Sequence, residues 1–504
     1  MSRGSGAAVN GLIQGSFLHA ASSISYKVFL RNGKAWMSYD RNPDTGMGKG
    51  QFPLHGERQL VYFIGSGHRG RTYLYQSNNQ WFEAPINYYS KKRLWDMAPN
   101  YGLTKTMPDA LPIDPNCLHC HTTEVQPSLP EARNKYIGAP FKQAGIGCSA
   151  CHGDPSAHLA EEGRGPIVNP AKLLPVRRDS VCLQCHLEGN VAIYRAGKSL
   201  AQFLPGDDLA NYVVYFVKKN AATGGGRASS QYEGLLRSAC KIASGDKLTC
   251  ITCHDPHSSP SVEDRVVYYR DKCLACHTGA AMANEHHPEQ KDCTVCHMPS
   301  LKTTDISHEQ TTDHDIQRYQ KTAHLAQANL ADSDSLIPIG NTTPSDREYG
   351  LAYAQLVEQG SQADGEKALY FLQKAEEDGA SDDRLHTQIA FLEQMAGDRT
   401  GAGAEYSAAL RENPYQTAAL GNMAIMDATT GHSADAVRLL QRVVAADANQ
   451  LTAGLDLAFI ECKTDNREEA LHVLTTLSRL NPDDPVLRKF MSSGIYRGQY
   501  CDVH

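Results

Sequence analysis

The pattern Cys-x-x-Cys-His occurs six times in this chain of 504 residues, and it constrains the fold more than any other feature. The six copies begin at Cys117, Cys148, Cys182, Cys250, Cys273 and Cys293. With 15 cysteines and 21 histidines in the chain, chance would produce roughly 0.02 copies of such a motif. The repetition therefore reflects a chemical requirement.

Two thiols at this spacing can add to the two vinyl groups of one haem, and the histidine that follows can bind its iron. Zinc sites and redox dithiols also use paired cysteines, but neither requires a histidine after every pair. The sequence therefore predicts six haems c as cofactors. The predicted thioether anchors are Cys117, Cys120, Cys148, Cys151, Cys182, Cys185, Cys250, Cys253, Cys273, Cys276, Cys293 and Cys296. The predicted proximal iron ligands are His121, His152, His186, His254, His277 and His297.

The composition changes along the chain and predicts a multidomain protein. Residues 1–110 are expected to be a small β-rich region, because alternating apolar segments flank the turn dipeptide Asn32-Gly33. Residues 111–318 hold all six motifs, about 35 residues per haem, which is too few for a conventional core. We expect a cytochrome domain of short helices and loops packed on the haems, followed by a polar linker at 319–344.

A sequence repeat occupies 345–500, with the period of about 34 residues that is typical of tetratricopeptide repeats. Small residues recur in register, as at Ala390, Ala424 and Ala458, and let paired helices approach closely. This pattern predicts an all-α solenoid of about four such repeats, with a short insertion in the first copy near 360–365. Solenoids of this kind present surfaces that bind proteins or peptides.

Charge divides between these regions. Residues 345–504 contain 14 basic and 25 acidic residues, net −11, within a chain whose total charge is −7. Nucleic acid is therefore not an expected partner, whereas a protein surface with basic character is. No apolar run approaches the length that a membrane-spanning helix needs, so we expect no transmembrane segment.

Each haem iron has a second axial position, for which histidines outside the motifs are the candidates. Histidine ligation favours low potentials, whereas methionine raises them. Not every candidate can be a ligand, since some histidines serve only as surface or hydrogen-bonding groups. The candidates are His158, His257, His286, His287, His308, His314 and, in the β-rich region, His19.

Thioether attachment of haem takes place outside the bacterial cytoplasm, so we expect a periplasmic or outer-surface protein. The segment from Met1 to Leu18 lacks the basic and apolar regions of a secretory signal, and we expect the true start to lie upstream. The three remaining cysteines, Cys240, Cys462 and Cys501, are expected to be free or buried thiols.

The segments Cys148 to His158, Cys182 to His186, Cys250 to His257 and Thr312 to His314 resemble a family of multihaem cytochromes. That family is typified by the tetrahaem cytochrome c that accepts electrons from hydroxylamine oxidoreductase. More broadly, the chain resembles proteins of soil bacteria such as acidobacteria that fuse such a domain to tetratricopeptide repeats. Those proteins usually carry a signal peptide and one further motif upstream. The resemblance implies extracytoplasmic electron transfer between redox partner proteins.

Two functional classes remain open. An electron carrier needs closely spaced haems and no catalytic residue. A reductase of a small nitrogen oxyanion needs an iron without a distal side chain, and the Cys-x-x-Cys-Lys motif of pentahaem nitrite reductases is absent. The sequence therefore favours the carrier over the reductase. Nothing specific supports a third, purely structural role.

Overall fold

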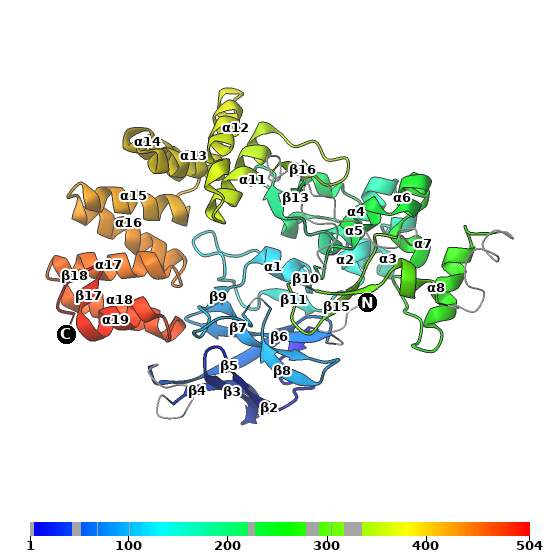
Figure 1. Cartoon of the computed structure of the whole chain (residues 1–504), viewed down its shortest axis with the longest axis horizontal. Coiled ribbons are helices and arrows are strands. Elements are labelled where there is room, and N and C mark those ends of the chain that lie inside the picture. Colours follow the sequence, from blue (N-terminus) through cyan, green and yellow to red (C-terminus); the bar gives the residue numbers. More distant parts are fainter. Residues whose placement is uncertain are drawn as a thin grey trace. The chain divides into compact units, whose positions relative to one another are not determined.

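The structure is a computed structural model that describes residues 5–42, 52–67, 69–99, 101–219, 227–278, 292–303, 305–316 and 335–503 (Figure 1). The chain divides into two compact units. The motif unit is Ile146–Pro344, and the sheet–repeat unit combines Ser2–Gly145 with Ser345–His504. None of the described helices has the length and apolar character needed to cross a membrane.

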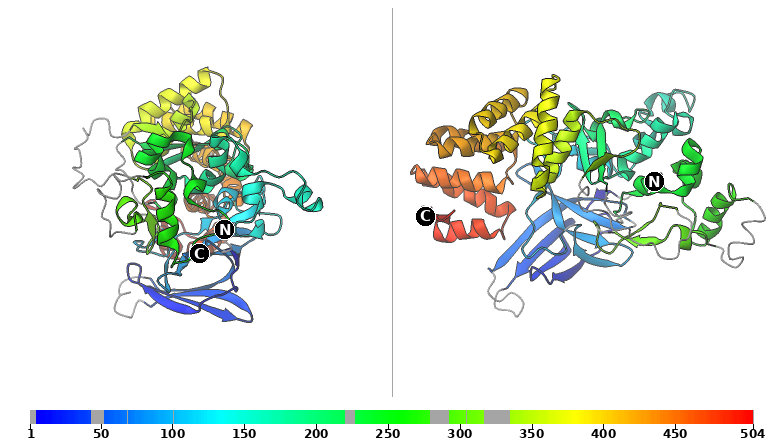
Figure 2. Two further views of the ribbon diagram at one scale, coloured as in Figure 1. Left: turned by 90° about the vertical axis from the view of Figure 1, so that its right-hand side faces the viewer. Right: turned by 45° about the horizontal axis from the view of Figure 1, so that its top comes forward.

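The sheet–repeat unit begins with an antiparallel sheet of nine strands, seven of which follow one another in chain order (Figure 2). At Asn32 and Gly33 both backbone φ angles are positive, at 52° and 71°, so the predicted dipeptide makes the tight turn between two strands. The strands are β1 Gly6–Ala7, β2 Gly15–His19, β3 Ile24–Arg31, β4 Lys34–Arg41, β5 Leu54–Ile64, β6 Gly70–Ser77, β7 Gln80–Tyr89, β8 Leu94–Met97 and β9 Leu111–Pro112. The predicted β-rich region is confirmed.

The segment after β9 packs on the same sheet and carries the first motif. It comprises α1 Pro115–His119, β10 Thr122–Val125 and β11 Phe141–Ala144. Leu118 of α1 is buried in an apolar cluster with Ile64, Leu74 and Trp81 of the sheet. The first motif is therefore part of the sheet–repeat unit, apart from the other five.

The repeats follow the predicted period. The first helices of three successive repeats begin at Asp383, Thr417 and Leu451, at the constant interval that the sequence repeat predicts. The helices are α11 Asp346–Glu358, α12 Gly365–Glu377, α13 Asp383–Ala396, α14 Arg399–Glu412, α15 Thr417–Thr429, α16 Ser433–Ala446, α17 Leu451–Lys463, α18 Arg467–Leu480 and α19 Pro485–Ser493. A 3₁₀ turn at Gln362–Asp364 forms the insertion in the first repeat.

Close helix contacts explain why small residues recur in the repeats. Ala390, Ala424 and Ala458 are fully buried. At Gly454 in α17 an added Cβ would lie 2.8 Å from the side chain of Leu477 in α18. The pairing of these helices therefore depends on the absence of larger side chains at their contacts.

Buried polar contacts join the last repeats to the sheet. Asp483 accepts hydrogen bonds from both terminal nitrogens of Arg41, at the end of β4, and the pair is almost inaccessible to solvent. The same carboxylate accepts a bond from the backbone N–H of Met107 at 2.8 Å. Arg58 of β5 donates to the carbonyl of Leu480 at 3.0 Å. The repeats and the sheet therefore form one unit, although they come from opposite ends of the chain.

A disulfide closes the end of the repeats. Cys462 in α17 is bonded to Cys501, which follows the hairpin of β17 Ile495–Tyr496 and β18 Gln499–Tyr500. The expectation of free thiols is therefore wrong for these two residues, because the hairpin turns the chain end back onto α17. Cys240 is not in a disulfide.

The motif unit consists of short elements. Its helices are α2 Ser149–His152, α3 Ser156–Ala160, α4 Pro175–His186, α5 Gln231–Arg237, α6 Ala239–Ser244, α7 Cys250–Cys253, α8 Arg265–Leu274 and α10 Thr294–His297. Its strands are β12 Val191–Tyr194, β13 Val213–Lys218, β14 Ser300–Lys302, β15 Gln310–Thr312 and β16 Leu336–Pro338. They form a three-stranded and a two-stranded antiparallel sheet.

Replacing Asp483 tests the buried junction. Asp483→Ala leaves Arg41 buried without its counter-ion, and removing one partner of a buried pair costs about 3–5 kcal/mol. We expect a markedly lower unfolding midpoint of the sheet–repeat unit, measured by circular dichroism. Glu468→Ala, at an exposed carboxylate of α18, is the control and should change little. Equal midpoints for the two variants would contradict the junction.

Candidate haem-binding sites

Each Cys-x-x-Cys-His motif lies on or beside a short helical segment. In four motifs the backbone N–H of the histidine donates to the carbonyl of the first cysteine, at 2.9–3.1 Å. These histidines are His152, His254, His277 and His297. Residues three apart on a helix share a face, so both thiols of a motif point to one side. None of the twelve motif cysteines, all of them described, is in a disulfide.

Within the motif unit, cysteines of successive motifs lie next to one another. The thiols of Cys182 and Cys250 are neighbours, and the Cys250 thiol, together with burial, raises the pKa of Cys182. Burial and the neighbouring Cys293 likewise raise the pKa of the Cys273 thiol. The third motif's helix α4 packs on α2 of the second, and α7 of the fourth on α8 of the fifth. Motifs two to six therefore form a continuous series in space.

Several histidines have the ring orientation of metal ligands. Nδ1 of His152 lies 2.7 Å from the carbonyl oxygen of Val168. Nδ1 of His158 lies 2.8 Å from the carbonyl oxygen of Gly165, and Nδ1 of His314 lies 2.9 Å from that of Thr312. A carbonyl only accepts, so each Nδ1 carries the proton, and the lone pair of the neutral ring is on Nε2. Metal-binding histidines are held in the same way by a hydrogen bond from the other ring nitrogen.

Two predicted proximal histidines each lie near a predicted distal one. The ring centroids of His152 and His257 are 5.9 Å apart, with ring planes 12° from parallel. Those of His254 and His314 are 6.2 Å apart. Two imidazoles on opposite sides of one metal ion, each with a nitrogen about 2.0 Å from it, have centroids about 6 Å apart. Both separations fit this arrangement.

Desolvation and the neighbouring histidines lower the pKa of the exposed His254, and desolvation lowers that of His314 against the opposing effects of Thr312 and Asp313. A lower pKa keeps the ring neutral, and only the neutral ring can donate a lone pair to a metal. The electrostatics of this pair therefore favour metal binding over protonation.

The residues around motifs four to six lack a hydrophobic core of their own. Among the described residues between 227 and 316, no hydrophobic side chain is buried. Val262 is 87% exposed and Ile242 is 73% exposed. Folded proteins rarely leave a long segment without buried apolar side chains, so these residues fit a large apolar group as their packing partner.

The first motif is held by the end of the sheet. The carboxylate of Asp114 caps α1 by accepting from the N–H groups of Asn116 and Cys117, at 2.8 and 3.1 Å. Cys117 and His121 are exposed at the surface, but desolvation by the surrounding atoms raises the pKa of the Cys117 thiol to about 12 and lowers the pKa of His121. Burial also raises the pKa of Glu83, on β7, to about 7, and its carboxylate is close enough to influence Cys117.

The candidate ligand His19 lies in the sheet and is hydrogen-bonded there. His19 is buried in β2, and its Nε2 donates to the carbonyl of Gly102 at 3.1 Å. Its Nδ1 therefore accepts from the hydroxyl of Ser22 at 2.7 Å. Both ring nitrogens of His19 are thus engaged in hydrogen bonds within the chain, and its role as an iron ligand stays a prediction.

The remaining candidates are placed differently. His308 is exposed and has a left-handed backbone conformation, with φ of 62°. His257 is also exposed, and its Nδ1 lies 3.7 Å from Asp255. His286 and His287 lie outside the described residues.

Groups that orient the histidines had no recognisable sequence signal. The carbonyls of Gly165 and Val168 are backbone atoms, which any residue could supply. The side-chain oxygen of Gln231 accepts from Nδ1 of His186 at 3.1 Å, although the two residues are distant in the chain. Glu83 was missed because nothing in its strand marks a carboxylate as buried.

Comparisons with known families agree with two parts of this description. A family model described as cytochrome c554 and c-prime matches residues 88–153, which include the first two motifs. A tetratricopeptide repeat model matches residues 430–493. The chain thus combines a segment similar to c-type cytochromes with repeats of this class, and the cytochrome match points to haem c as the cofactor.

No curated protein matches the chain. The similar solved structures include one from work on Pseudomonas aeruginosa pilF, 21% identical over 28% of this chain, with a TM-score of 0.25. A tetratricopeptide repeat protein from Parabacteroides merdae is 16% identical over 28%, with a TM-score of 0.25. YrrB, described as having an unusual peptide-binding site, is 19% identical over 28% of this chain and 70% of its own, with a TM-score of 0.24. The chain spans 65% and 56% of the first two structures.

Glu83 makes stability depend on pH in a predictable direction. Its pKa of about 7 in the folded chain exceeds the ordinary value of 4.5, so between these values only the folded chain holds the proton. The protonated Glu83 therefore contributes up to about 3 kcal/mol to the free energy of unfolding. This contribution is full below about pH 4.5 and is lost as the pH rises through about 7. Glu83→Gln should remove it, which unfolding midpoints between pH 5 and 8 would show.

The control is Glu161→Gln, at an exposed carboxylate, which should keep the pH dependence of the unmodified chain. An unchanged pH dependence in Glu83→Gln would contradict the buried, protonated state of Glu83.

Proposed function

We propose that this chain is an extracytoplasmic multihaem cytochrome that carries electrons between protein partners through six covalently bound haems c. The tetratricopeptide repeats dock one of those partners. The observation that carries this proposal is the continuous series of motifs two to six, in which α2 packs on α4 and α7 on α8, and the neighbouring thiols Cys250 and Cys293 raise the pKa of Cys182 and of Cys273. Haems anchored on neighbouring motifs would lie close together, and electron transfer from haem to haem requires short separations.

The chain's own residues hold and orient the cofactors. The paired cysteines of each motif form the thioether bonds, and the histidine that follows binds the iron. We propose His257 as the distal partner of His152, and His314 as the distal partner of His254, because of their ring separations. His158 is a further distal ligand, since the carbonyl of Gly165 leaves its Nε2 open. Bound haem c supplies one-electron redox chemistry at its iron.

The described residues between 227 and 316 bury no apolar side chain, which supports packing on several haems. Attached haems would cover the exposed apolar side chains of this segment, such as Ile251 and Val295. They would replace the core that the segment does not build itself. The same contact would keep water away from the irons and favour electron transfer over side reactions.

The disulfide between Cys462 and Cys501 supports a location outside the cytoplasm. Disulfides persist in oxidising compartments and are rare in the cytoplasm. Haem attachment by thioethers has the same requirement. Both features favour the periplasm or the outer cell surface.

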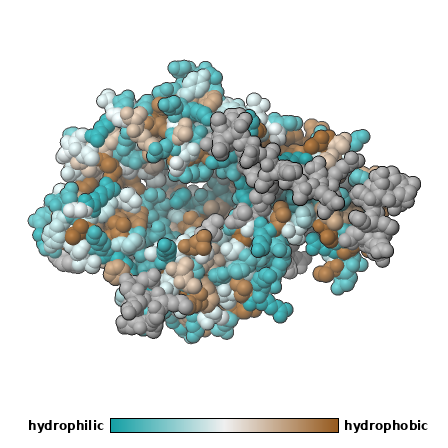
Figure 3. Space-filling model, in the orientation of Figure 1, coloured by the Kyte–Doolittle hydropathy of each residue, from teal (hydrophilic) through white to brown (hydrophobic). Residues whose placement is uncertain are grey.

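The charge of the repeats suggests the kind of partner. Their net charge is −11, and on the face seen in Figure 3 their surface is mostly hydrophilic, with scattered apolar residues. Such a surface suits a basic protein or peptide whose approach is steered by charge. Its binding should therefore weaken as the salt concentration rises.

Electron paramagnetic resonance of the oxidised protein tests this function. We expect only low-spin haems, because a carrier needs two axial ligands on every iron. A high-spin, five-coordinate haem would contradict the carrier and favour the reductase of a small oxyanion.

The variant His314→Ala tests the ligand pairing. It should convert one haem to the high-spin state and raise the reduction potential of that haem, with the haem count unchanged. His472→Ala, at an exposed histidine of the repeats, is the matched control and should leave the spectrum unaltered. If His314→Ala gave the same spectrum as the control, His314 would not be a ligand.

A further inference from the structure

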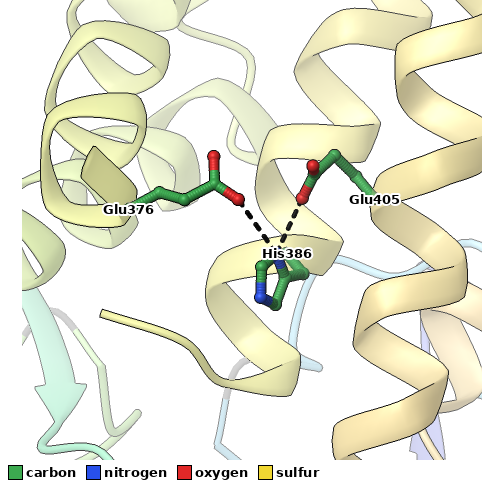
Figure 4. A group of neighbouring side chains, drawn as sticks. All are labelled: Glu376, His386 and Glu405. Carbon is green, nitrogen blue, oxygen red and sulfur yellow. Dashed lines mark hydrogen bonds and ion pairs between the residues drawn. The ribbon is translucent and has the colours of Figure 1, made fainter. Parts of the chain in front are cut away.

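A second group of metal-ligating side chains lies in the repeats, apart from the haem motifs. His386 of α13 stands between Glu376 of α12 and Glu405 of α14 (Figure 4). Nδ1 of His386 is 2.7 Å from a carboxylate oxygen of Glu405 and 3.6 Å from one of Glu376. One ligand atom from each residue lies within 4.8 Å of the others. The group therefore joins three consecutive helices at one point.

The proton on the other nitrogen of His386 can be assigned. Nε2 lies 2.9 Å from the hydroxyl of Ser381, and that hydroxyl donates to Glu412 at 3.3 Å. A serine hydroxyl has one hydrogen, so it must accept from Nε2–H. The lone pair of Nδ1 then faces the oxygens of Glu376 and Glu405, which also carry lone pairs. A proton or a metal cation between Nδ1 and these oxygens would remove the repulsion. A carboxylate and a hydroxyl behind the ring are also the kind of support that metal-binding histidines have.

The charge around His386 is unbalanced. Burial and then the charge of Glu405 raise the pKa of Glu376. Burial raises the pKa of Glu393, as do the charges of Glu405, Asp398 and Glu376. Within the described residues, no lysine or arginine is ion-paired to Glu376, Glu393 or Glu405. One imidazole thus faces several carboxylates, and one oxygen of Glu393 is buried without a hydrogen bond.

We propose that Glu376, His386 and Glu405 bind one zinc ion through Nδ1 and one oxygen of each carboxylate, with water as the fourth ligand. Zinc accepts mixed nitrogen and oxygen ligands at about 2.0–2.2 Å in a tetrahedral arrangement. The three side chains would occupy three of its four positions. A neutral imidazole with two carboxylates suits a first-row divalent cation better than calcium or magnesium, which take oxygen ligands. The bound ion would fix α12, α13 and α14 relative to one another.

Calorimetric titration of the haem-loaded protein with zinc chloride tests the site. The chain has other exposed histidines, so the measurement is a comparison of variants. The unmodified protein should bind one more zinc ion with high affinity than Glu405→Gln, which keeps the size of the side chain but removes its charge. The control Glu366→Gln, at an exposed carboxylate of α12, should bind as the unmodified protein does. Identical zinc titrations for Glu405→Gln and the control would overturn the proposal.

Glu376→Gln provides a second variant with little risk of unfolding, since the Glu376 side chain is 38% exposed. It should weaken zinc binding at least about tenfold, because loss even of supporting groups costs about 10–100-fold in affinity. Zinc should also raise the thermal midpoint of the unmodified repeats, but not that of Glu405→Gln. Unchanged affinity in Glu376→Gln, or a midpoint insensitive to zinc in the unmodified protein, would show that His386 holds only a proton between the carboxylates.

Discussion

The local geometry of the Cys-x-x-Cys-His turn is the constraint on which the rest of this structure depends. A helical turn places two thiols on one side and positions the histidine after them, as the bonds from His152 and His254 to the first cysteines of their motifs show. Because each turn is complete within a single short motif, the intervening chain needs only short helices and loops. The order of these turns in space follows from the packing of α2 on α4 and of α7 on α8 and from the proximity of the Cys182 and Cys250 thiols.

The two units are stabilised differently. The sheet–repeat unit has an apolar core and a buried junction in which Asp483 serves both Arg41 and the backbone of Met107. Residues 227–316 of the motif unit bury no described apolar side chain. Under our proposal the haems supply that interior, so this unit would depend on cofactor attachment while the other would not. Asp483 ties the repeats to the sheet, so removing the repeats would break this buried ion pair and expose the sheet surface that they cover.

Local patterns in the sequence were sufficient for part of this structure. The turn at Asn32 and Gly33 and the regular period of the repeats depend on nearby residues, and both are confirmed. Contacts between distant segments have no such pattern. The pairing of Cys462 with Cys501 depends on how the final hairpin returns, and the bond from His19 to Gly102 depends on a backbone carbonyl. For the same reason a list of candidate distal histidines could be written from the sequence, whereas the pairing that we propose for two of them rests on ring separations in the structure.

The number of covalently bound haems per chain tests the central claim most directly. Haem absorbance measured against protein concentration, with the intact mass of the denatured chain, gives this number. We expect six haems that remain on the chain after extraction with acidified acetone, since thioether bonds survive that treatment. Fewer than six haems, or haem that dissolves in the acetone, would contradict the account.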